Sequence, residues 1–426
     1  MQGMDQNICI FAYMERLTAF ISEHLKDETT RLILDRKKWP DIDMELAVNC
    51  IESRRKLRGK VQEWYDEPRL IFPLKLSAEQ CSSSSTARYK ADLAQRIIGM
   101  ADGRISDLTG GLGVDSWHFS KIAAKVMYNE MQTPLCDAAR HNFAVLGAGN
   151  IEISNCAVSS KKDSQGTPVQ ALLEGFRPDL VFMDPARRGE GGRKVFLIEE
   201  CTPDVLTLKD EILGLCPHLL IKLSPMADIS MVCDRLGNRC REVHVVASGG
   251  ECKELLIWMD RSWEDGYTIT AVELDNTGNA HTLSFDPSVQ YVADYDHPQS
   301  DAAFLFEPGK ALMKAGAFNF ISEKFGMAKL GRSTHYYLLD KEQPELQHLG
   351  KLFRILRIDP LDKRTMKAAG KEFPHSEVTA RNIPMDTDAL RKRLGVSSGD
   401  DAHIFGLKSD RSGNLLIIAR PADEYQ

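Results

Sequence analysis

The chain has 426 residues, too many for one ordinary hydrophobic core, so its length predicts several domains. Hydrophobic residues make up 43% of it and charged residues 27%, the balance of a soluble globular protein, and no apolar run is long enough for a membrane span. The formal net charge of −7 excludes a protein that is basic over its whole surface, although local basic patches for nucleic acid are compatible with it.

Residues 1–80 are expected to form an N-terminal helical domain. Apolar residues recur at spacings of three and four in residues 9–25 and 42–57, as on the buried face of a helix. Residues 53–60, SRRKLRGK, then place five basic side chains in eight positions. This stretch is either the solvated end of a helix or a patch that faces RNA phosphates.

The pattern changes from about residue 101 onward. Short apolar runs alternate with helical stretches, and this alternation predicts a mostly parallel α/β sheet with helices on both faces. Strands are expected in residues 104–108, 124–131, 151–158, 178–186 and 218–225, followed by a hairpin over 241–260.

Residues 105–116, ISDLTGGLGVDS, read as a glycine-rich turn between a strand and a helix. The GxGxxG spacing of dinucleotide dehydrogenases is absent, and two flanking aspartates would repel a pyrophosphate. They suit a ligand with a cationic amino-acid end and no phosphate, which is the chemistry of S-adenosylmethionine. The residues expected around this ligand are Asp107 at the strand end, Gly110, Gly111 and Gly113 in the turn, and Asp115 at the helix start.

The stretch DLTGGLGVDS, which includes Thr109, is similar to motif I of the class I S-adenosylmethionine-dependent methyltransferases. The resemblance implies a Rossmann-like, seven-stranded methyltransferase sheet that binds this cofactor. It also implies that Glu130, at the end of the next strand, accepts hydrogen bonds from both ribose hydroxyls. At the end of the third strand, Asn155 would meet the adenine amine, with Cys156 as the competing position.

Residues 82–93, SSSSTARYKADL, resemble the segment that in this family folds over the methionine end of the cofactor. The resemblance implies that Thr86 and Lys90 contact the methionine end of the cofactor. The alternative is that this segment is a helix cap followed by an exposed lysine. Lys222 and Ser224, at the fifth strand, would border the substrate or be ordinary polar residues of a strand end.

The fourth expected strand ends in VFMDPARRG, which resembles motif IV of methyltransferases that modify amino groups. Asp184 and Pro185 match this motif and would orient a nitrogen lone pair toward the methyl group. Ala186 and Arg187 replace a proline and an aromatic residue, so Arg187 would stack on a base or, like Arg188, pair with a phosphate. The alternative is a solvated loop. No Pro-Cys dipeptide follows a strand end, so catalysis by a thiolate is not expected.

The charge balance swings in the C-terminal part of the chain. Residues 255–310 carry ten acidic and two basic side chains, whereas residues 351–395 carry eleven basic and six acidic ones. This swing predicts at least one separate C-terminal domain. The basic side chains Arg381, Arg391, Lys392 and Arg393 would track RNA phosphates, or form the exposed face of an amphipathic helix.

Three C-terminal segments, FEPGKALMKAGAFNF, VTARNIPMDTDALRKRLGV and HIFGLKSDRSGNLLIIARP, resemble a group of bacterial methyltransferases with two small α+β domains after the catalytic one. The resemblance implies RNA binding, chiefly of tRNA, by the last of them. The implied domains are an N-terminal helical domain (1–80), a methyltransferase domain (81–265), a ferredoxin-like domain (266–335) and a THUMP-like domain (336–426).

Together these features predict an S-adenosylmethionine-dependent methyltransferase that transfers a methyl group directly to a base of tRNA or rRNA. Basic patches in the N-terminal and C-terminal domains are expected to bind this RNA. Ala186 and Arg187 leave open a degenerate RNA-binding protein that retains the cofactor fold. A methyltransferase of proteins or small molecules also stays open, and a nicotinamide-dependent oxidoreductase is disfavoured by the GGxG spacing.

The ten cysteines bear on location and metals. They are scattered, without a CxxC pair or the Cys/His spacing of a zinc site. We interpret them as reduced thiols of a cytoplasmic protein that needs no metal and no membrane. The oligomeric state is not predicted.

Overall fold

The computed structural model describes residues 2–100, 102–161, 166–187, 198–295 and 302–422. The chain divides into two compact units. The first contains residues 1–243, 254–266 and 277–279, and the second contains residues 244–253, 267–276 and 280–426. Among the described residues, no helix is both long enough and apolar enough to cross a lipid bilayer.

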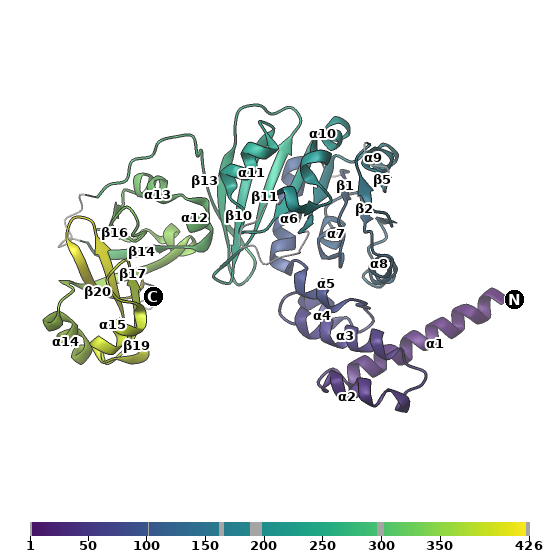
Figure 1. The fold of residues 1–426 in the computed structure, drawn as a ribbon, viewed down its shortest axis with the longest axis horizontal. Helices are drawn as coiled ribbons and strands as arrows, with labels where there is room; N and C mark the ends of the chain where they lie inside the picture. The colour runs from purple at the N-terminus through teal and green to yellow at the C-terminus, as the bar shows by residue number, and fades with distance from the viewer. Residues whose placement is uncertain (1, 101, 162–165, 188–197, 296–301, 423–426) are drawn as a thin grey trace. The chain divides into compact units, whose positions relative to one another are not determined.

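Helices form the N-terminal part of the first unit, as the apolar spacing predicted. They are α1 (Gln2–Glu23), α2 (Thr29–Leu34), α3 (Met44–Leu57), α4 (Gln62–Asp66) and α5 (Lys75–Gln80). The Asp43 carboxylate caps α3 by accepting a hydrogen bond from Leu46 N at 3.1 Å. Figure 1 shows α3, α4 and α5 gathered in one group. Packing of these helices holds the polypeptide of residues 67–83 in place.

A parallel-rich sheet follows. Its strands include β1 (Arg104–Asp107), β2 (Lys125–Asn129), β3 (Ile151–Ser154), β6 (Leu180–Met183), β9 (His218–Leu223), β10 (Cys240–Ser248) and β11 (Glu251–Asp260). The hydrogen-bonded order of these strands is β10-β11-β9-β6-β1-β2-β3. Strands β9, β6, β1, β2 and β3 are parallel, and β11 is antiparallel to β9. The seven strands from β10 to β3 confirm the predicted Rossmann-like methyltransferase sheet.

Helices and short strand pairs connect these strands. The helices are α6 (Ser84–Ile98), α7 (Val114–Phe119), α8 (Thr133–Val145), α9 (Val169–Phe176), α10 (Val205–Leu215) and α11 (Ile229–Leu236). Ser83 caps α6, and Pro134 lies in the first turn of α8. The short pairs are β4 (Val158–Ser159) with β5 (Thr167–Pro168), and β7 (Ala186–Arg187) with β8 (Cys201–Thr202). The loops after the parallel strands begin at one edge of the sheet, where open α/β sheets bind ligands.

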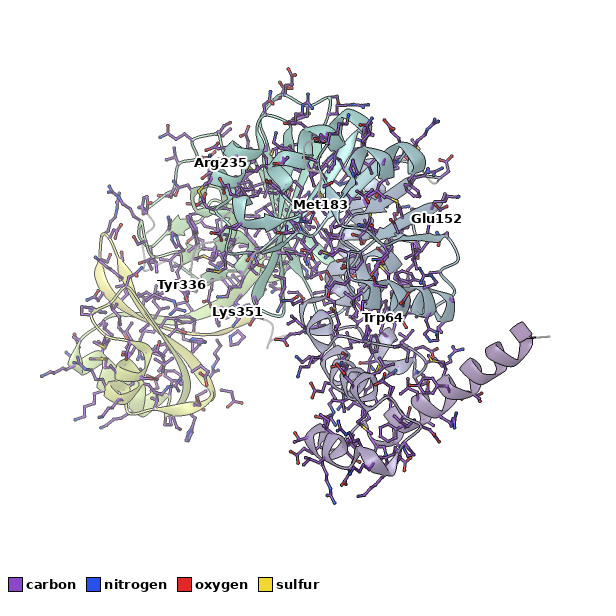
Figure 2. All side chains as sticks on the ribbon, turned by 45° about the vertical axis from the view of Figure 1, so that its right-hand side comes forward. Trp64, Glu152, Met183, Arg235, Tyr336 and Lys351 are labelled. Carbon is purple, nitrogen blue, oxygen red and sulfur yellow. The ribbon has the colours of Figure 1, made fainter. Side chains whose placement is uncertain are left out.

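The N-terminal helices share a hydrophobic core with this sheet. Trp64 of α4 is fully buried and packs edge-on against Trp117 of α7, with ring centroids 6.0 Å apart. The Asn142 side chain of α8 accepts a hydrogen bond from Ile71 N and donates one to Ile71 O, each at 2.8 Å. Figure 2 labels Trp64 near the N-terminal helices and Met183 within the sheet. This shared core fixes α5 beside the sheet, and the domain boundary at residue 80 stays a prediction.

The second unit contains the hairpin β12 (Thr268–Leu274) and β13 (Ala280–Phe285) and a seven-stranded sheet of order β15-β16-β14-β17-β20-β19-β18. The sheet strands are β14 (Phe304–Pro308), β15 (Ala328–Lys329), β16 (Tyr337–Leu339), β17 (Gly350–Pro360), β18 (His375–Arg381), β19 (Ser397–Ser409) and β20 (Gly413–Pro421). Its helices are α12 (Lys310–Ala315), α13 (Phe318–Phe325), α14 (Lys363–Glu372) and α15 (Thr387–Leu394). Met366 of α14 and Leu390 of α15 are buried in one core with Ile418 of β20.

Candidate functional site

The described residues of the first unit enclose a cavity of about 840 Å³ at the carboxyl edge of the sheet. Its wall comes from the loops after β1, β2, β3 and β6, the segment between α5 and α6, and the start of α10. Four carboxylates and one ammonium group are its charged lining groups, those of Asp115, Glu130, Asp184, Asp204 and Lys222. This excess of three negative charges favours a cationic small molecule and opposes a pyrophosphate.

Asp107 holds the glycine-rich turn from within the protein. Its side chain is buried, and its carboxylate accepts hydrogen bonds from Thr109 N at 3.0 Å and from Ser116 Oγ at 2.5 Å. Burial raises the pKa of Asp107 to about 7 against the opposing effect of these two hydrogen bonds. The geometry shows how Asp107 shapes the turn, and its own contact with the cofactor stays a prediction.

Two glycines of the turn are required by neighbouring aromatic rings. A Cβ atom on Gly110 would lie 2.2 Å from Cε2 of Tyr128, and one on Gly113 would lie 2.7 Å from Cζ of Phe143. Gly113 also has a φ of +96°, which side chains rarely adopt. The turn therefore packs tightly against β2 and α8 while Gly110, Gly111 and Gly113 line the cavity on its other side.

Glu130 joins the turn to the end of β2. It lines the cavity, and its Oε2 accepts a hydrogen bond from Gly111 N at 3.0 Å while its Oε1 accepts one from Gln132 N at 2.8 Å. Each carboxylate oxygen has a second lone-pair direction for another donor. This arrangement presents a pre-oriented acceptor to the cavity, as the predicted role with ribose hydroxyls requires.

Lys90 lies in a buried cluster of charges behind Asp115. Its side chain is fully buried, and Nζ donates hydrogen bonds to Ser82 Oγ at 2.9 Å and to Glu254 Oε1 at 2.8 Å. Nζ also lies 3.2 Å from Asp115 Oδ1, and Ser82 Oγ donates to Asp115 Oδ2 at 2.8 Å. The alternative of an exposed lysine is therefore wrong. Lys90 fixes Asp115, which reaches the cavity, and does not line it.

Burial alone would raise the pKa of Asp115, but the ammonium groups of Lys90 and Lys222 outweigh burial and lower it. Asp115 therefore keeps its negative charge at neutral pH although it is almost completely buried. A buried carboxylate that stays ionised at the cavity wall is a suitable partner for a cationic ligand group.

Thr86 and Asn155 use their polar atoms in local hydrogen bonds. Thr86 Oγ1 donates to Ser83 O at 3.2 Å within the first turn of α6. The Asn155 amide donates to Glu130 O at 2.7 Å, and its oxygen accepts from Thr133 Oγ1 at 2.9 Å. The side chains that line the cavity near them are those of Ser82 and Cys156. The cofactor contacts of Thr86 and Asn155 stay predictions.

Asp184, at the end of β6, lies next to the glycine-rich turn. Its backbone N donates a hydrogen bond to Thr109 Oγ1 at 2.6 Å, which ties motif I to the fourth parallel strand. The carboxylate lines the cavity, and Pro185 behind it is buried. The backbone of Arg187 is paired in β7, but the side chains of Arg187 and Arg188 lie outside the described residues.

Lys222 of β9 pairs with Asp184, a contact that was not predicted. Nζ donates a hydrogen bond to Asp184 Oδ2 at 2.5 Å, and both side chains line the cavity. Burial alone would lower the pKa of Lys222, but the carboxylates of Asp184, Glu254 and Asp115 outweigh burial and raise it. Lys222 is therefore a cation at neutral pH. Ser224, its predicted companion, accepts a hydrogen bond from Met226 N at 3.2 Å.

The N-terminal basic stretch is mostly committed to internal contacts. Arg54 is buried, and its guanidinium donates hydrogen bonds to the backbone oxygens of Tyr65, Glu67, Pro68 and Leu70. Arg55 donates to Leu25 O at 2.7 Å, and Lys60 donates to Ala78 O at 3.2 Å. Arg54 is therefore neither part of a solvated helix end nor available to RNA phosphates, and the expected N-terminal RNA patch does not include it.

The C-terminal basic cluster is more accessible. Lys392 and Arg393 on α15 are exposed. Arg391 donates to Glu377 Oε2 and to Ser376 O, each at 3.3 Å, and Arg381 donates to Ala380 O at 3.2 Å. Helix α15 buries Leu390 and Leu394 and exposes Lys392 and Arg393, so an amphipathic helix and a phosphate-facing surface are both compatible with it.

Among the described residues, no group of histidine, cysteine and acidic side chains is arranged to hold a metal ion. Nine of the ten cysteines have described side chains, and these nine are reduced thiols. The structure describes no disulfide among these nine residues.

Comparisons with known proteins agree with this geometry. Family models match residues 304–346 as a ferredoxin-like domain and residues 350–421 as a THUMP domain-like region. The crystal structure of a candidate methyltransferase from Porphyromonas gingivalis W83 aligns with a TM-score of 0.81 and 27% identity, covering 96% of this chain and 98% of that one.

Two sequence relatives add to this. A protein of Mycobacterium tuberculosis (strain CDC 1551 / Oshkosh), named an uncharacterised S-adenosylmethionine-dependent methyltransferase, is 24% identical over 323 residues, which are 74% of this chain and 78% of that protein. A tRNA/tmRNA (uracil-C(5))-methyltransferase of Photobacterium profundum is 24% identical over 225 residues, 47% of this chain and 61% of that protein. The chain is an S-adenosylmethionine-dependent methyltransferase with a ferredoxin-like and a THUMP-like domain in its C-terminal part.

Proposed function

We propose that this methyltransferase acts on a base of tRNA or rRNA by direct transfer of the methyl group. The observation that carries the proposal is the acidic cavity in which motif I meets the end of β6 through the 2.6 Å contact of Asp184 N with Thr109 Oγ1. A cofactor bound along the turn would have its methyl group beside a carboxylate that can orient a nucleophile.

The cofactor would be held by groups that the fold already fixes. Glu130 would accept the ribose hydroxyls, since its position is set by the backbone N–H groups of Gly111 and Gln132. Asp115 would attract the ammonium group of the methionine end, since it is ionised and lines the cavity. S-adenosylmethionine supplies an electrophilic methyl group on a sulfonium, and the excess negative charge of the cavity stabilises that cation.

The cysteines of the cavity oppose covalent catalysis. Methyl transfer to carbon 5 of a pyrimidine needs a thiolate that first adds to the ring. Burial raises the pKa of Cys81 to about 11, so its thiol is protonated at neutral pH. The Cys156 thiol is engaged as a donor to Asn129 Oδ1 at 3.1 Å. We therefore propose that a nitrogen of the base attacks the methyl group in one in-line displacement.

RNA as the substrate rests on the C-terminal part of the chain. The THUMP-like region contains α15, whose exposed Lys392 and Arg393 can approach phosphates. The Photobacterium profundum relative is named for methylation of tRNA and tmRNA, and we extend RNA, but not its target atom, to this chain. Such RNAs would place the reaction in the cytoplasm, where free thiols such as those described are stable.

The test is transfer of tritiated methyl groups into bulk tRNA, rRNA and protein from cells that lack this gene. We expect label in RNA, a loss of at least 100-fold with Asp184→Ala, and normal transfer with Glu152→Gln, whose side chain is exposed outside the cavity. Label in protein alone would remove RNA from the proposal. Transfer that survives Asp184→Ala would remove Asp184 from the reaction.

A degenerate protein without transfer is the second candidate, favoured by Ala186 and Arg187 at motif IV. It predicts binding of S-adenosylhomocysteine and RNA without any transfer of label. Binding of RNA itself is tested by its salt dependence, since each lost phosphate contact reduces the slope of log K against log salt by about one. Replacement of Lys392 and Arg393 by alanine should reduce that slope, whereas Lys125→Ala on β2 should not change it.

A further inference from the structure

The pairing of Asp184 with Lys222 gives the substrate end of the cavity a donor and an acceptor side by side. Lys222 Nζ lies 2.5 Å from Asp184 Oδ2, and the Lys222 side chain is 14% exposed while that of Asp184 is 37% exposed. The ammonium group has three N–H donors, and one contact with Asp184 leaves others for a substrate. The second oxygen of Asp184 stays an acceptor.

This pair differs from what a simple exocyclic amine requires. An amine needs acceptors that orient its N–H groups, and its nitrogen gains positive charge as the methyl group is transferred. A buried ammonium beside that nitrogen would oppose this charge. Lys222 is the basic side chain among the described residues that line the cavity, so its position at Asp184 calls for a substrate that accepts a hydrogen bond there.

Given the proposed function, on which this inference rests, we propose that Asp184 and Lys222 recognise the –CO–NH– edge of a base, so that the methylated atom is a ring nitrogen next to a carbonyl. Guanine and uracil carry this edge. Lys222 donates to the carbonyl oxygen, and Asp184 accepts from the ring N–H. Adenine and cytosine lack a carbonyl beside a ring N–H.

The proton and electron balance follows from the same two residues. Asp184 takes the proton from the ring N–H, and the freed electron pair of the nitrogen forms the new N–CH3 bond. The S–CH3 bond breaks, and its electrons convert the sulfonium into a neutral thioether. The negative charge that spreads onto the carbonyl oxygen as the proton leaves is stabilised by the Lys222 ammonium.

The Lys222 cation is maintained by its surroundings. Asp184, Glu254 and Asp115 keep it protonated although it is buried, as their effect on its pKa outweighs the effect of burial. Glu254 and Asp115 also bind Lys90, so the two lysines share one buried set of carboxylates. Lys222 can therefore donate to a substrate without losing all of its negative partners.

The experiment incubates the purified full-length protein, RNA from cells lacking the gene, and S-adenosylmethionine with a deuterated methyl group. The RNA is digested to nucleosides, and mass spectrometry locates the label. Label on N1 of guanosine or N3 of uridine supports the inference. Label on an exocyclic amine of adenosine or cytidine overturns the inference and leaves the proposed function in place. Label on a carbon overturns the inference and also the proposed attack by a nitrogen. Absence of label from RNA overturns both.

Two variants test the role of Lys222 itself. Lys222→Met should reduce the rate at saturating cofactor at least 100-fold in protein that still binds S-adenosylhomocysteine. Its melting temperature should fall, because Asp184, Glu254 and Asp115 lose a neighbouring cation. Lys222→Arg, which keeps a cationic donor, should retain more of the rate. Lys125→Met, in an exposed ion pair with Glu152, serves as the control. A rate for Lys222→Met within threefold of the wild type would show that Lys222 only balances charge, and would overturn the inference.

Discussion

The two ends of the cavity are built in different ways. At the glycine-rich turn, backbone groups and buried side chains satisfy one another, as in the contacts of Asp107 with Ser116 and of Glu130 with Gly111. At the end of β6, the partly exposed Asp184 and the largely buried Lys222 face the cavity. We propose that the first end holds the cofactor in a rigid geometry and that the second keeps hydrogen-bonding capacity for the substrate. Changes at the first end should therefore cost stability, and changes at the second should cost reaction rate.

The largest loss of stability is expected for Lys90→Met. This change leaves Glu254 and Asp115 buried without their shared cation, which should reduce the free energy of unfolding by about 3–5 kcal/mol. Urea unfolding of the purified protein measures it. Adding Glu254→Gln to Lys90→Met should recover part of the loss, because one stranded carboxylate becomes neutral.

The exposed pair of Lys125 with Glu152 is the matched control, and its loss should cost about 1 kcal/mol or less. Equal effects of Lys90→Met and Lys125→Met would show that the buried cluster does not stabilise the turn end.

Asp107 should make the stability of this end depend on pH. Burial raises its pKa in the folded protein to about 7, whereas in the unfolded chain it titrates near its ordinary value. Folding therefore takes up a proton between about pH 4 and pH 7, so the contribution of Asp107 to stability falls as pH rises through this range, by at most about 1.4 kcal/mol per pH unit.

Asp107→Asn removes this titration. The free energy of unfolding of the variant minus that of the wild type should therefore increase from pH 5 to pH 7.5, as measured by urea unfolding at both values. A difference that is the same at both pH values would contradict the raised pKa.

Gly110→Ala should have a smaller effect on stability. The new Cβ would lie 2.2 Å from the Tyr128 ring, and relief of such an overlap costs about 1–3 kcal/mol. Gly175→Ala in α9, where a Cβ meets no atom within 4 Å, should leave stability unchanged or slightly raised. Thermal unfolding compares the two variants, and an equal response would show that the turn is not packed as tightly as the structure indicates.

The same contrast explains what the sequence could predict. The contacts of Asp107 join neighbours in sequence, since Thr109 and Ser116 lie within nine residues of it, so a local motif identifies this part of the turn end. The pairs that define the rest join distant positions: Lys90 and Glu254 are 164 residues apart, and Asp184 and Lys222 are 38 apart. No local pattern gives such partners, because they meet only when the sheet assembles.

The basic stretch of residues 53–60 shows the same limit. Its composition suggested a surface for phosphates, but Arg54 lies on the buried side of α3 and binds the backbone that leads to α5. Whether one residue of a charged run is buried depends on which elements pack against its helix. Composition carries no information about this packing. The parallel strands and the turn of residues 105–116 between a strand and a helix, by contrast, follow from local sequence and were predicted correctly.

The central claim is that the turn end binds the cofactor and the β6 end acts on the substrate. Calorimetric titration of S-adenosylhomocysteine into the wild type, Glu130→Gln and Asp184→Asn tests it most directly. Because this ligand has no sulfonium charge, its binding reports on the groups at the glycine-rich turn and not on the charge near the methyl group. We expect Glu130→Gln to weaken binding at least tenfold, since hydrogen bonds to a charged group contribute about 1.5–3 kcal/mol, and Asp184→Asn to stay within threefold of the wild type. Loss of binding in Asp184→Asn with normal binding in Glu130→Gln would contradict the account.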